Sequence, residues 1–389
     1  MANAEPRQPR SRAGLLLLAG ATVLAASVFA AILERRIQVD IPLHAREALR
    51  LGRGQALQPH FLYHVALLCV SGFQLRLKVL FGASVVVLAL AVLGKMLLSI
   101  RIARRQLGHL LPRSPRSELL LAAGAVSLAF VHNLPVSTSR EVQLAIGEIP
   151  PNVWHNPTTI FLMPFALALF HCGLRLLERP DAPLLKRLAW LSALNVLAKP
   201  SYFFAFAPSF GILALLRFGV TPRLFRAAAA LAAGGVLVAA QAALLARGSG
   251  EPGPGVAVSF LFLWHQYSAN LPASFLASMA FPLAFVACDP RAVVRSRIAR
   301  FAWVGWAVGM VPFLFLVETG ERMQHWNFRW QATVCTYLLF LVTLLELARG
   351  VASRGALRGR DRALLALYSA HVASGVWYLQ RLVFHGLWR

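Results

Sequence analysis

The stretch "AGLLLLAGATVLAASVFAAI", residues 13–32, contains no charged residue over a length of 20 residues. The hydrocarbon core of a bilayer is about 30 Å thick, and an α-helix needs about 20 residues to cross it. A soluble domain does not require an unbroken apolar run of this length. The stretch therefore predicts a membrane-spanning helix, and similar runs recur along the rest of the chain.

The composition supports the same conclusion for the whole sequence. Of the 389 residues, 58% are hydrophobic and 14% are charged, which is unusual for a soluble protein. We therefore expect an all-α, polytopic transmembrane helical bundle that forms a single membrane domain. The apolar runs predict about eleven spans, at residues 13–32, 78–100, 118–135, 158–175, 188–198, 201–216, 224–246, 273–288, 301–317, 331–348 and 363–380.

Two adjacent segments are shorter than a bilayer requires. They are "LAWLSALNVLA" (188–198) and "YFFAFAPSFGILALL" (202–216), joined by Lys199, Pro200 and Ser201. Together they predict a hairpin of two short helices, with its tip at or just below the non-cytoplasmic surface. A backbone that is broken at this depth is tolerated only where protein or a water-filled cavity surrounds it.

The formal net charge of +24 comes from clusters of basic residues between the spans. Six clusters hold 24 of the 39 lysine and arginine residues, 14 others lie on the opposite side, and Lys95 lies within a span. Because cytoplasmic loops carry the excess of basic residues, we expect an integral plasma (inner) membrane protein with a cytoplasmic N-terminus. Topology thus explains the charge, and no nucleic-acid partner is expected. The clusters lie at residues 7–12, 101–116, 175–187, 217–226, 291–300 and 349–362.

The N-terminus and the cysteines carry two further expectations. Basic residues precede the first apolar run, as in a cleaved signal peptide, but about twenty apolar residues favour an uncleaved first span. The cysteines lie within or beside apolar runs, with no CxxC pair and no zinc spacing. We interpret them as small buried hydrophobic residues, namely Cys69, Cys172, Cys288 and Cys335.

The first non-cytoplasmic loop, residues 33–60, contains a polar helical face. Asp40, His44 and Glu47 are spaced at i, i+4 and i+7, which places them on one face of any helix that begins there. One interpretation is that Asp40 is an N-cap, with Pro42 in the first turn of the helix. The other is chemical, because a carboxylate beside a histidine can act as a general base or help to hold a divalent cation. The spacing is compatible with both.

The second non-cytoplasmic loop, residues 136–157, ends within the stretch "PPNVWHNPTTIF", residues 150–161. Trp154, His155 and Asn156 stand there together, directly before a predicted span. An aromatic face at this position can stack on a sugar, and Asn156 or His155 can hydrogen-bond its hydroxyl groups. The alternative is an interfacial tryptophan and a helix N-cap at Asn156, ahead of a proline. His155 has no part in that alternative.

Other loops on the same side of the membrane supply further candidates. Lys199 either extends its ammonium group to the membrane surface or meets an anion. The stretch "MQHWNFRW" (323–330) repeats the His, Trp and Asn types of the second loop and offers the same two interpretations. The further candidates are His60, His64, His265, Arg322, His325, Asn327 and Arg329.

Taken in order, these features resemble the GT-C superfamily of integral membrane glycosyltransferases. The first span is followed by a long loop with an acidic residue, and "QPHFLYHVALL" (58–68) leads into the next helices. The following span closes on the basic cluster "LLSIRIARR" (97–105). The stretch "LSALNVLAKPSYFFAFAP" (191–208) is similar to the helix pair that this family builds around a Lys-Pro-Ser/Thr step. The resemblance covers residues 13–216 in order.

The resemblance implies transfer of a sugar from a polyprenyl-phosphate carrier to an envelope glycan, lipid or protein on the non-cytoplasmic face. Asp40 matches the catalytic acidic residue of the family, with His44 and Glu47 beside it on the predicted helix. The family often has an acidic pair in this loop, whereas this chain has Asp40 and then Glu47. Substrate binding is expected from cationic and sugar-contacting side chains, namely Lys199, Arg322, Arg329, Trp154, His155, Asn156, His265, His325 and Asn327.

Three other functions use similar features. A transporter or flippase of lipid-linked saccharides would need ionisable residues along a path through several spans, but apart from Lys95 and Lys199 the spans are nearly uncharged. A polymerase or ligase of lipid-linked saccharides would share the loops on the non-cytoplasmic side. A non-catalytic envelope-assembly protein would share the scaffold alone. No metal ligands are assigned from the sequence, and a divalent cation remains a candidate cofactor.

Overall fold

The structure is a computed structural model that describes residues 11–55, 59–112, 114–135, 147–248, 255–320, 323 and 327–386. Its longer helices follow the apolar runs of the sequence, because a helix satisfies every backbone hydrogen bond internally where no water is present. They are α1 (Arg12–Glu34), α4 (Leu77–Leu107), α5 (Pro115–Phe130), α6 (Pro157–Glu178), α7 (Ala182–Ala198), α8 (Ser201–Phe218), α9 (Pro222–Gly248), α11 (Leu271–Cys288), α13 (Arg297–Phe315), α14 (Trp330–Arg354) and α15 (Gly359–His385).

The shorter elements lie between the long helices. One antiparallel pair of strands, β1 and β2, places Ala257 opposite Val317. This ribbon was not expected from the sequence, and among the described residues it is the one departure from an all-helical fold. The short elements are α2 (Asp40–Gly52), α3 (Leu62–Val70), α10 (Phe262–Tyr267), α12 (Pro290–Arg295), the 3-10 helix η2 (Asn327–Arg329), β1 (Val256–Val258) and β2 (Leu316–Glu318).

The expected class of fold is confirmed, since the chain is a helical membrane protein. Each of the expected spans falls on one of the long helices. Eight of the described helices are long and apolar enough to cross a membrane, and these are α1, α4, α6, α8, α9, α11, α13 and α14. The total of eleven spans stays a prediction, because α5, α7 and α15 are not among these eight.

The expected pair of short helices is wrong in its lengths. Helix α7 begins at Ala182, well before the apolar segment, because the Asp181 side chain accepts a hydrogen bond from the Leu184 backbone N–H at 2.8 Å. It therefore has 17 residues and, at 1.5 Å per residue, is about 26 Å long. Helix α8 has 18 residues. The prediction from the apolar segment left out the first turns of α7, because they carry Lys186 and Arg187.

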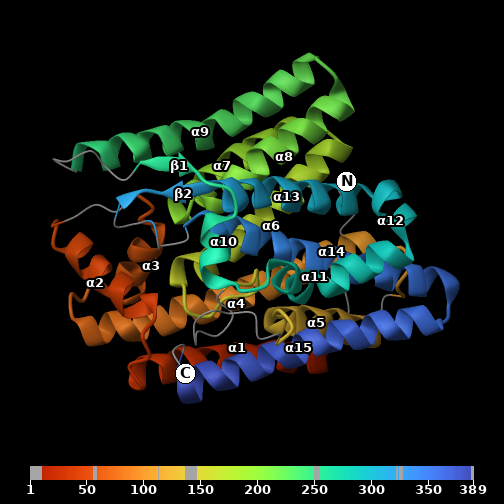
Figure 1. Cartoon of the computed structure of the whole chain (residues 1–389), viewed down its shortest axis with the longest axis horizontal. Helices are drawn as coiled ribbons and strands as arrows, with labels where there is room; N and C mark the ends of the chain where they lie inside the picture. The colour runs from red at the N-terminus through yellow and green to blue at the C-terminus, as the bar shows by residue number, and fades with distance from the viewer. Residues whose placement is uncertain are drawn as a thin grey trace, which may run out of the picture.

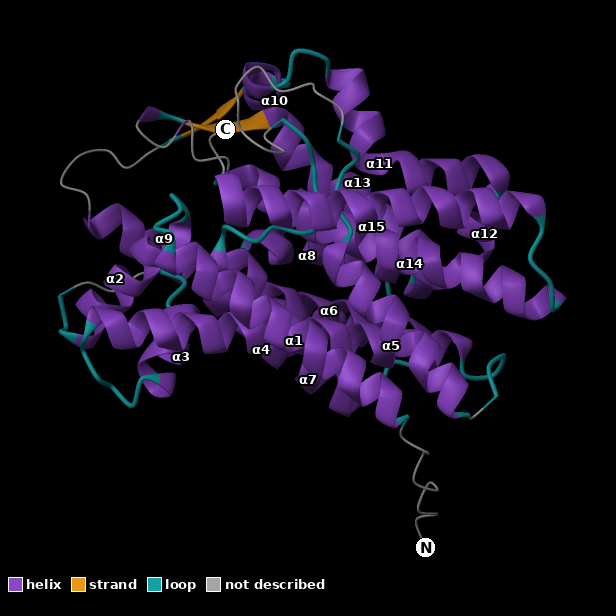
Figure 2. Ribbon diagram, turned by 90° about the horizontal axis from the view of Figure 1, so that it is seen from below, coloured by secondary structure: helices purple, strands orange, loops and turns teal. Residues whose placement is uncertain are grey.

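The long helices lie side by side, and Figure 1 shows their axes running in one general direction. Helices α2 and α3 and both strands lie at one end of this bundle, and α12 lies at the other. Figure 2 shows the same bundle from below, with the strands beside α10. The expected non-cytoplasmic segments that carry α2, β1 and β2 therefore lie towards this end of the bundle.

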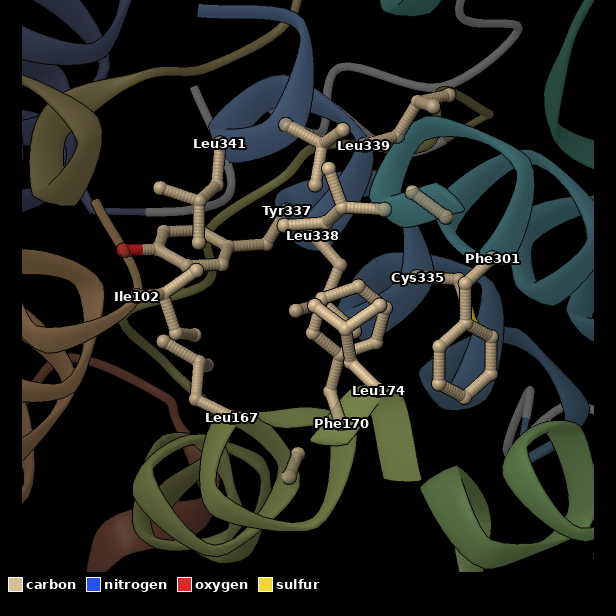
Figure 3. Packing of buried hydrophobic residues seen from close by; sticks show 14 of the residues in the cluster. Ile102, Leu167, Phe170, Leu174, Phe301, Cys335, Tyr337, Leu338, Leu339 and Leu341 are labelled. Carbon is tan, nitrogen blue, oxygen red and sulfur yellow. The ribbon is translucent and has the colours of Figure 1, made fainter. Parts of the chain in front are cut away.

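The core is built around α14, which is buried on almost all sides for its first four turns. Ile102 of α4, Phe170 of α6 and Leu338 of α14 converge in this core (Figure 3). Phe301 of α13 stacks against Phe170 with ring centroids 4.8 Å apart. A second cluster joins α1, α4 and α5. Because α14 packs against α4, α8, α11 and α13, its first turn is held in a defined position.

Candidate functional site

The first two loops that the sequence assigns to the non-cytoplasmic side meet through Asp40 and Asn156. Helix α2 begins at Asp40, and its N-cap is Val39, so the N-cap interpretation of Asp40 is wrong. The Asp40 carboxylate instead accepts a hydrogen bond from the Asn156 side-chain amide at 2.7 Å. The Asp40 backbone N–H also donates to the His155 carbonyl oxygen at 3.3 Å. These contacts fix the start of α2 against the segment that precedes α6.

Asn156 is the N-cap of α6, as its position before a proline predicts. Its side-chain oxygen accepts hydrogen bonds from the Thr159 backbone N–H at 3.0 Å and from the Thr159 hydroxyl at 2.7 Å. Its amide nitrogen is directed at Asp40. The capping role and the site role therefore use opposite ends of one side chain, and neither excludes the other.

Lys199 joins the same group of residues from the turn between α7 and α8. Its ammonium donates to the Asn156 side-chain oxygen at 3.0 Å and to the hydroxyls of Thr158 and Thr159 at 3.1 and 2.9 Å. It also lies 4.6 Å from the centre of the Trp330 ring, close enough for a cation–π interaction. The lysine is buried, and the three side chains that accept its hydrogen bonds are neutral. Its side chain is therefore directed into the protein and does not extend to the membrane surface.

The electrostatic setting of Lys199 follows from this burial. Burial lowers the pKa of Lys199 to about 7, although the Asp40 carboxylate opposes the shift. Asn156 hydrogen-bonds to both residues, so a carboxylate and an ammonium face one amide from two sides. No direct ion pair between Asp40 and Lys199 is formed, which leaves the ammonium charge uncompensated by direct contact. A bound anion would supply the missing compensation.

His155 lies behind Asn156 and faces the C-terminal part of the chain. Its ring Nδ1 is 3.3 Å from the Tyr378 hydroxyl of α15, and its ring centre is 6.0 Å from that of Trp330. Burial, together with Arg329 and Lys199, lowers the pKa of His155 to about 4, although Asp40 opposes the shift. His155 is therefore a neutral hydrogen-bonding group near pH 7.

Arg329 is buried just before α14. Its guanidinium donates to the Glu148 backbone oxygen at 2.6 Å, which ties the end of the second loop to the start of α14. Glu148 in turn accepts a hydrogen bond from the Asn133 side chain. Arg329 is one of the charged groups that act on His155. It therefore places a second cation behind the cluster of Asp40, Asn156 and Lys199.

The polar face of α2 contacts α3. His44 Nδ1 is 2.7 Å from a carboxylate oxygen of Glu47, and His64 Nε2 of α3 is 3.1 Å from the same oxygen. Burial alone would raise the pKa of Glu47, but the hydrogen bonds with His44 and His64 outweigh it and lower that pKa to about 2. These three side chains could hold a metal ion.

His60 precedes α3 in the first loop. Burial, with smaller contributions from Lys199, His44 and His64, lowers the pKa of His60 to about 3. Asp40 belongs to the first group of polar residues, His44 and Glu47 belong to the second, and all three lie on α2. The two groups therefore lie at the same end of the bundle.

Three predicted site residues lie away from this region. Trp154 is buried, with its ring 5.5 Å from that of Phe29 and 6.0 Å from that of Phe130, so it belongs to the hydrophobic core. His265 is exposed on α10. Asn327 is exposed and donates to the Glu318 carboxylate at 2.7 Å. Two other predicted residues, Arg322 and His325, lie outside the described residues.

Several residues of the site were not predicted. Thr158 and Thr159 follow Asn156 in the first turn of α6, and the stretch "NPTT" contained the signal, because hydroxyls in a first turn lie beside the capping side chain. Trp330 ends the stretch "MQHWNFRW" but was not predicted to be a site residue. Tyr378 had no local signal, since it lies within an apolar run of the sequence and is 223 positions from His155 along the chain.

A cavity of about 460 Å³ lies at the opposite end of the bundle. It is lined by Glu178 of α6, by Arg217 at the end of α8 and by Arg223 and Arg226 at the start of α9. These arginines belong to the clusters that the sequence assigns to the cytoplasm. The cavity lacks the pairing of a buried lysine with a carboxylate, so it does not share the character of the site around Asn156.

Comparison of the chain with family models, with curated proteins and with solved structures finds no match. The class of protein is therefore assigned from the fold, and no similar protein contributes to the assignment. The chain is a helical membrane protein. The candidate site around Asn156 lies at the end of the bundle that carries α2 and α3.

Proposed function

We propose that the chain is a membrane glycosyltransferase of the GT-C type. It would transfer a sugar from a polyprenyl-phosphate carrier to a cell-envelope glycan, lipid or protein on the non-cytoplasmic face. The polyprenyl chain would remain in the bilayer beside the helices. The reacting end of the donor would meet the protein at the end of the bundle that carries Asp40 and Lys199.

The observation that carries this proposal is the position of Asn156 between Asp40 and Lys199. A sugar transfer of this kind needs a base for the acceptor and a positive charge for the departing phosphate. The first two loops and the α7–α8 turn bring these two groups to one amide, although the sequence separates them widely. Lys199 has neutral acceptors and is not in an ion pair with Asp40, so its charge is suited to an arriving phosphate.

The proposed reaction is a direct displacement. The acceptor hydroxyl loses its proton to the Asp40 carboxylate while its oxygen forms a bond to the anomeric carbon of the sugar. The bond between that carbon and the phosphate oxygen breaks, and the phosphate leaves with the electron pair. Lys199 neutralises the negative charge that develops on the phosphate. The configuration at the anomeric carbon is inverted, since the acceptor attacks opposite the leaving group.

Asp40→Asn tests the assignment of the base. Asparagine is similar in size but cannot accept the proton, so transfer should fall by about 10² to 10⁴ while the protein melts in detergent like the parent. Cells that lack the gene would be complemented with wild type or variant, and their envelope glycans compared by mass spectrometry. The matched control is Asp181→Asn, because an asparagine keeps the N-cap of α7.

Three results decide the outcome. A glycan of fixed mass that is absent after deletion, restored by wild type and by Asp181→Asn and not restored by Asp40→Asn supports the proposal. Full restoration by Asp40→Asn would overturn the proposed mechanism. Envelope glycans that are unchanged after deletion would remove the glycosyltransferase itself and favour a non-catalytic role.

A further inference from the structure

A second site lies where α2 packs against α3. His44 Nδ1, a carboxylate oxygen of Glu47 and His64 Nε2 form a triangle with sides of 2.7, 3.1 and 3.1 Å. His44 and Glu47 are one helical turn apart on α2, and His64 comes from α3. All three ligand-type atoms are therefore directed at one point between the two helices.

Hydrogen bonds alone do not account for this triangle. Each ring nitrogen carries at most one proton. If both nitrogens are protonated, two donors face each other at the 3.1 Å contact between His44 and His64. If either nitrogen is unprotonated, its lone pair faces the ionised carboxylate of Glu47. No placement of protons satisfies all three contacts while Glu47 is ionised, whereas a cation would accept a lone pair from each atom.

The dimensions of the triangle suit a small transition-metal ion. Zinc binds imidazole nitrogen and carboxylate oxygen at about 2.0 to 2.2 Å with tetrahedral geometry. Two ligand atoms at such distances lie about 3.3 Å apart, so two sides of the triangle would open by about 0.2 Å and the 2.7 Å side by about 0.6 Å. Two imidazoles disfavour magnesium and calcium, which prefer ligand sets made entirely of oxygen.

We infer that His44, Glu47 and His64 bind a zinc ion between α2 and α3. Three protein ligands leave a fourth position open, as in zinc sites that hold a water or a substrate. The side chains of His44 and Glu47 are 13% and 18% exposed, whereas that of His64 is fully buried. The open position therefore lies towards the α2 side of the triangle.

Helices α2 and α3 pack against each other and against α4, and the ion would add a link between their polar side chains. Helix α2 begins at Asp40, four residues before His44, so an ion that fixes α2 on α3 also fixes the position of Asp40 beside Asn156. His44 and Glu47 would then act as positioning residues for Asp40. The inference does not depend on sugar transfer, because the site is defined by its ligand atoms alone.

Metal content tests the inference directly. The protein is purified without a histidine tag, incubated with zinc sulfate, dialysed and measured by inductively coupled plasma mass spectrometry. Wild type should retain about one zinc per chain at the three ligands. Glu47→Gln and His44→Gln should retain at least about tenfold less zinc. His109→Gln, which replaces an exposed histidine at the other end of the bundle, should retain as much as wild type.

A melting experiment in detergent supplies a second readout. A chelator should lower the melting temperature of wild type and of His109→Gln, because an ion that binds only the folded state stabilises it. It should leave the melting temperature of Glu47→Gln unchanged. Equal zinc content in wild type and Glu47→Gln would overturn the inference, as would full occupancy by another metal without zinc. His64→Gln removes the third proposed ligand. If His64→Gln does not fold, the measurements on Glu47→Gln decide the result.

The zinc site and the proposed sugar transfer can be tested independently of each other. Asp40→Asn should bind zinc like wild type, since Asp40 is not one of the three ligands. Loss of sugar transfer in that variant with zinc retained separates the catalytic proposal from the zinc site. Loss of zinc in Glu47→Gln supports the site even if no sugar transfer is found.

Discussion

Asn156 holds two groups of opposite charge near each other without letting them form an ion pair. Its amide nitrogen donates to Asp40 and its oxygen accepts from Lys199. A direct ion pair would neutralise both groups and would have to be broken before either could act. An amide between them keeps the carboxylate available as a base and the ammonium available for an anion. The choice of residue at this position is therefore part of the proposed chemistry.

Lys199→Met should show how the buried charge acts. If the Lys199 side chain must be protonated to bind the carrier phosphate, the wild-type transfer rate should fall as the pH rises through about 7, the pKa of Lys199. Lys199→Met should lower transfer by about 10² or more near pH 6.5 and should lack this fall. The control is Lys186→Met, which removes an exposed lysine from α7. Transfer that stays normal in Lys199→Met would remove Lys199 from the mechanism.

The same residue predicts how stability depends on pH. The unfolded chain keeps Lys199 protonated up to about 10.5, its ordinary pKa, whereas the folded chain releases the proton near 7. Between these values the unfolded state binds more protons, so the free energy of unfolding should rise with pH. Lys199→Met should remove this part of the rise. Melting temperatures of both proteins, measured from pH 6 to pH 10 without donor, test the difference, and parallel curves would contradict it.

At the scale of elements, the approach of α15 to the end of α5 decides where Tyr378 lies. The His132 backbone N–H donates to the His371 carbonyl oxygen at 3.0 Å, and the Ser374 hydroxyl donates to the Asn133 carbonyl oxygen. The backbone of α15 is close to residues 131–133 because Gly375 has no side chain there. A turn later on α15, Tyr378 reaches His155.

Gly375→Ala should therefore destabilise the protein. A glycine in a helix usually costs about 1 kcal/mol relative to alanine, but a Cβ at Gly375 would overlap the Phe130 carbonyl oxygen. The matched control is Gly124→Ala on α5, where an added Cβ meets nothing within 4 Å. We expect the melting temperature to fall for Gly375→Ala and to stay level or rise for Gly124→Ala. Similar shifts for both variants would show that the helices do not approach so closely.

For the whole molecule, the bundle separates two ends of different character. One end carries the buried polar groups around Asn156 and the triangle of His44, Glu47 and His64. The opposite end carries the exposed basic clusters, including the arginines around the 460 Å³ cavity. The proposed function requires the first end to face away from the cytoplasm, because basic clusters mark the cytoplasmic side.

Labelling of single cysteines tests this orientation. Cys69 and Cys288 are exposed, so the expectation that all four cysteines are buried is wrong for these two. In a background where both are replaced by serine, Arg53→Cys and Arg291→Cys place one accessible thiol at each end of the bundle. In intact cells, after permeabilisation of any outer membrane, a membrane-impermeant thiol reagent should modify the cysteine at position 53. The cysteine at position 291 should react only after lysis. The reverse result would place Asp40 in the cytoplasm and exclude the proposed donor face.

Local chemistry determined which parts of the chain are helices and marked several of the polar residues that meet in the site. Hydropathy marked the long helices because a membrane permits few alternatives to an apolar helix. Asn156 before Pro157 predicted the start of α6 because capping involves only neighbouring residues. The periodicity of Asp40, His44 and Glu47 predicted one face of α2 for the same reason.

Tertiary packing alone decided which of these residues meet. Asp40 and Asn156 are 116 residues apart, and His155 and Tyr378 are 223 apart. Their contacts depend on how α2, α6 and α15 are packed, and no local pattern encodes this. The Trp154 ring packs in the core against Phe29 and Phe130, which belong to two other helices. His64 joined the polar face of α2 because α3 folds back on it, so the metal-binding triangle exists only once both helices are in place.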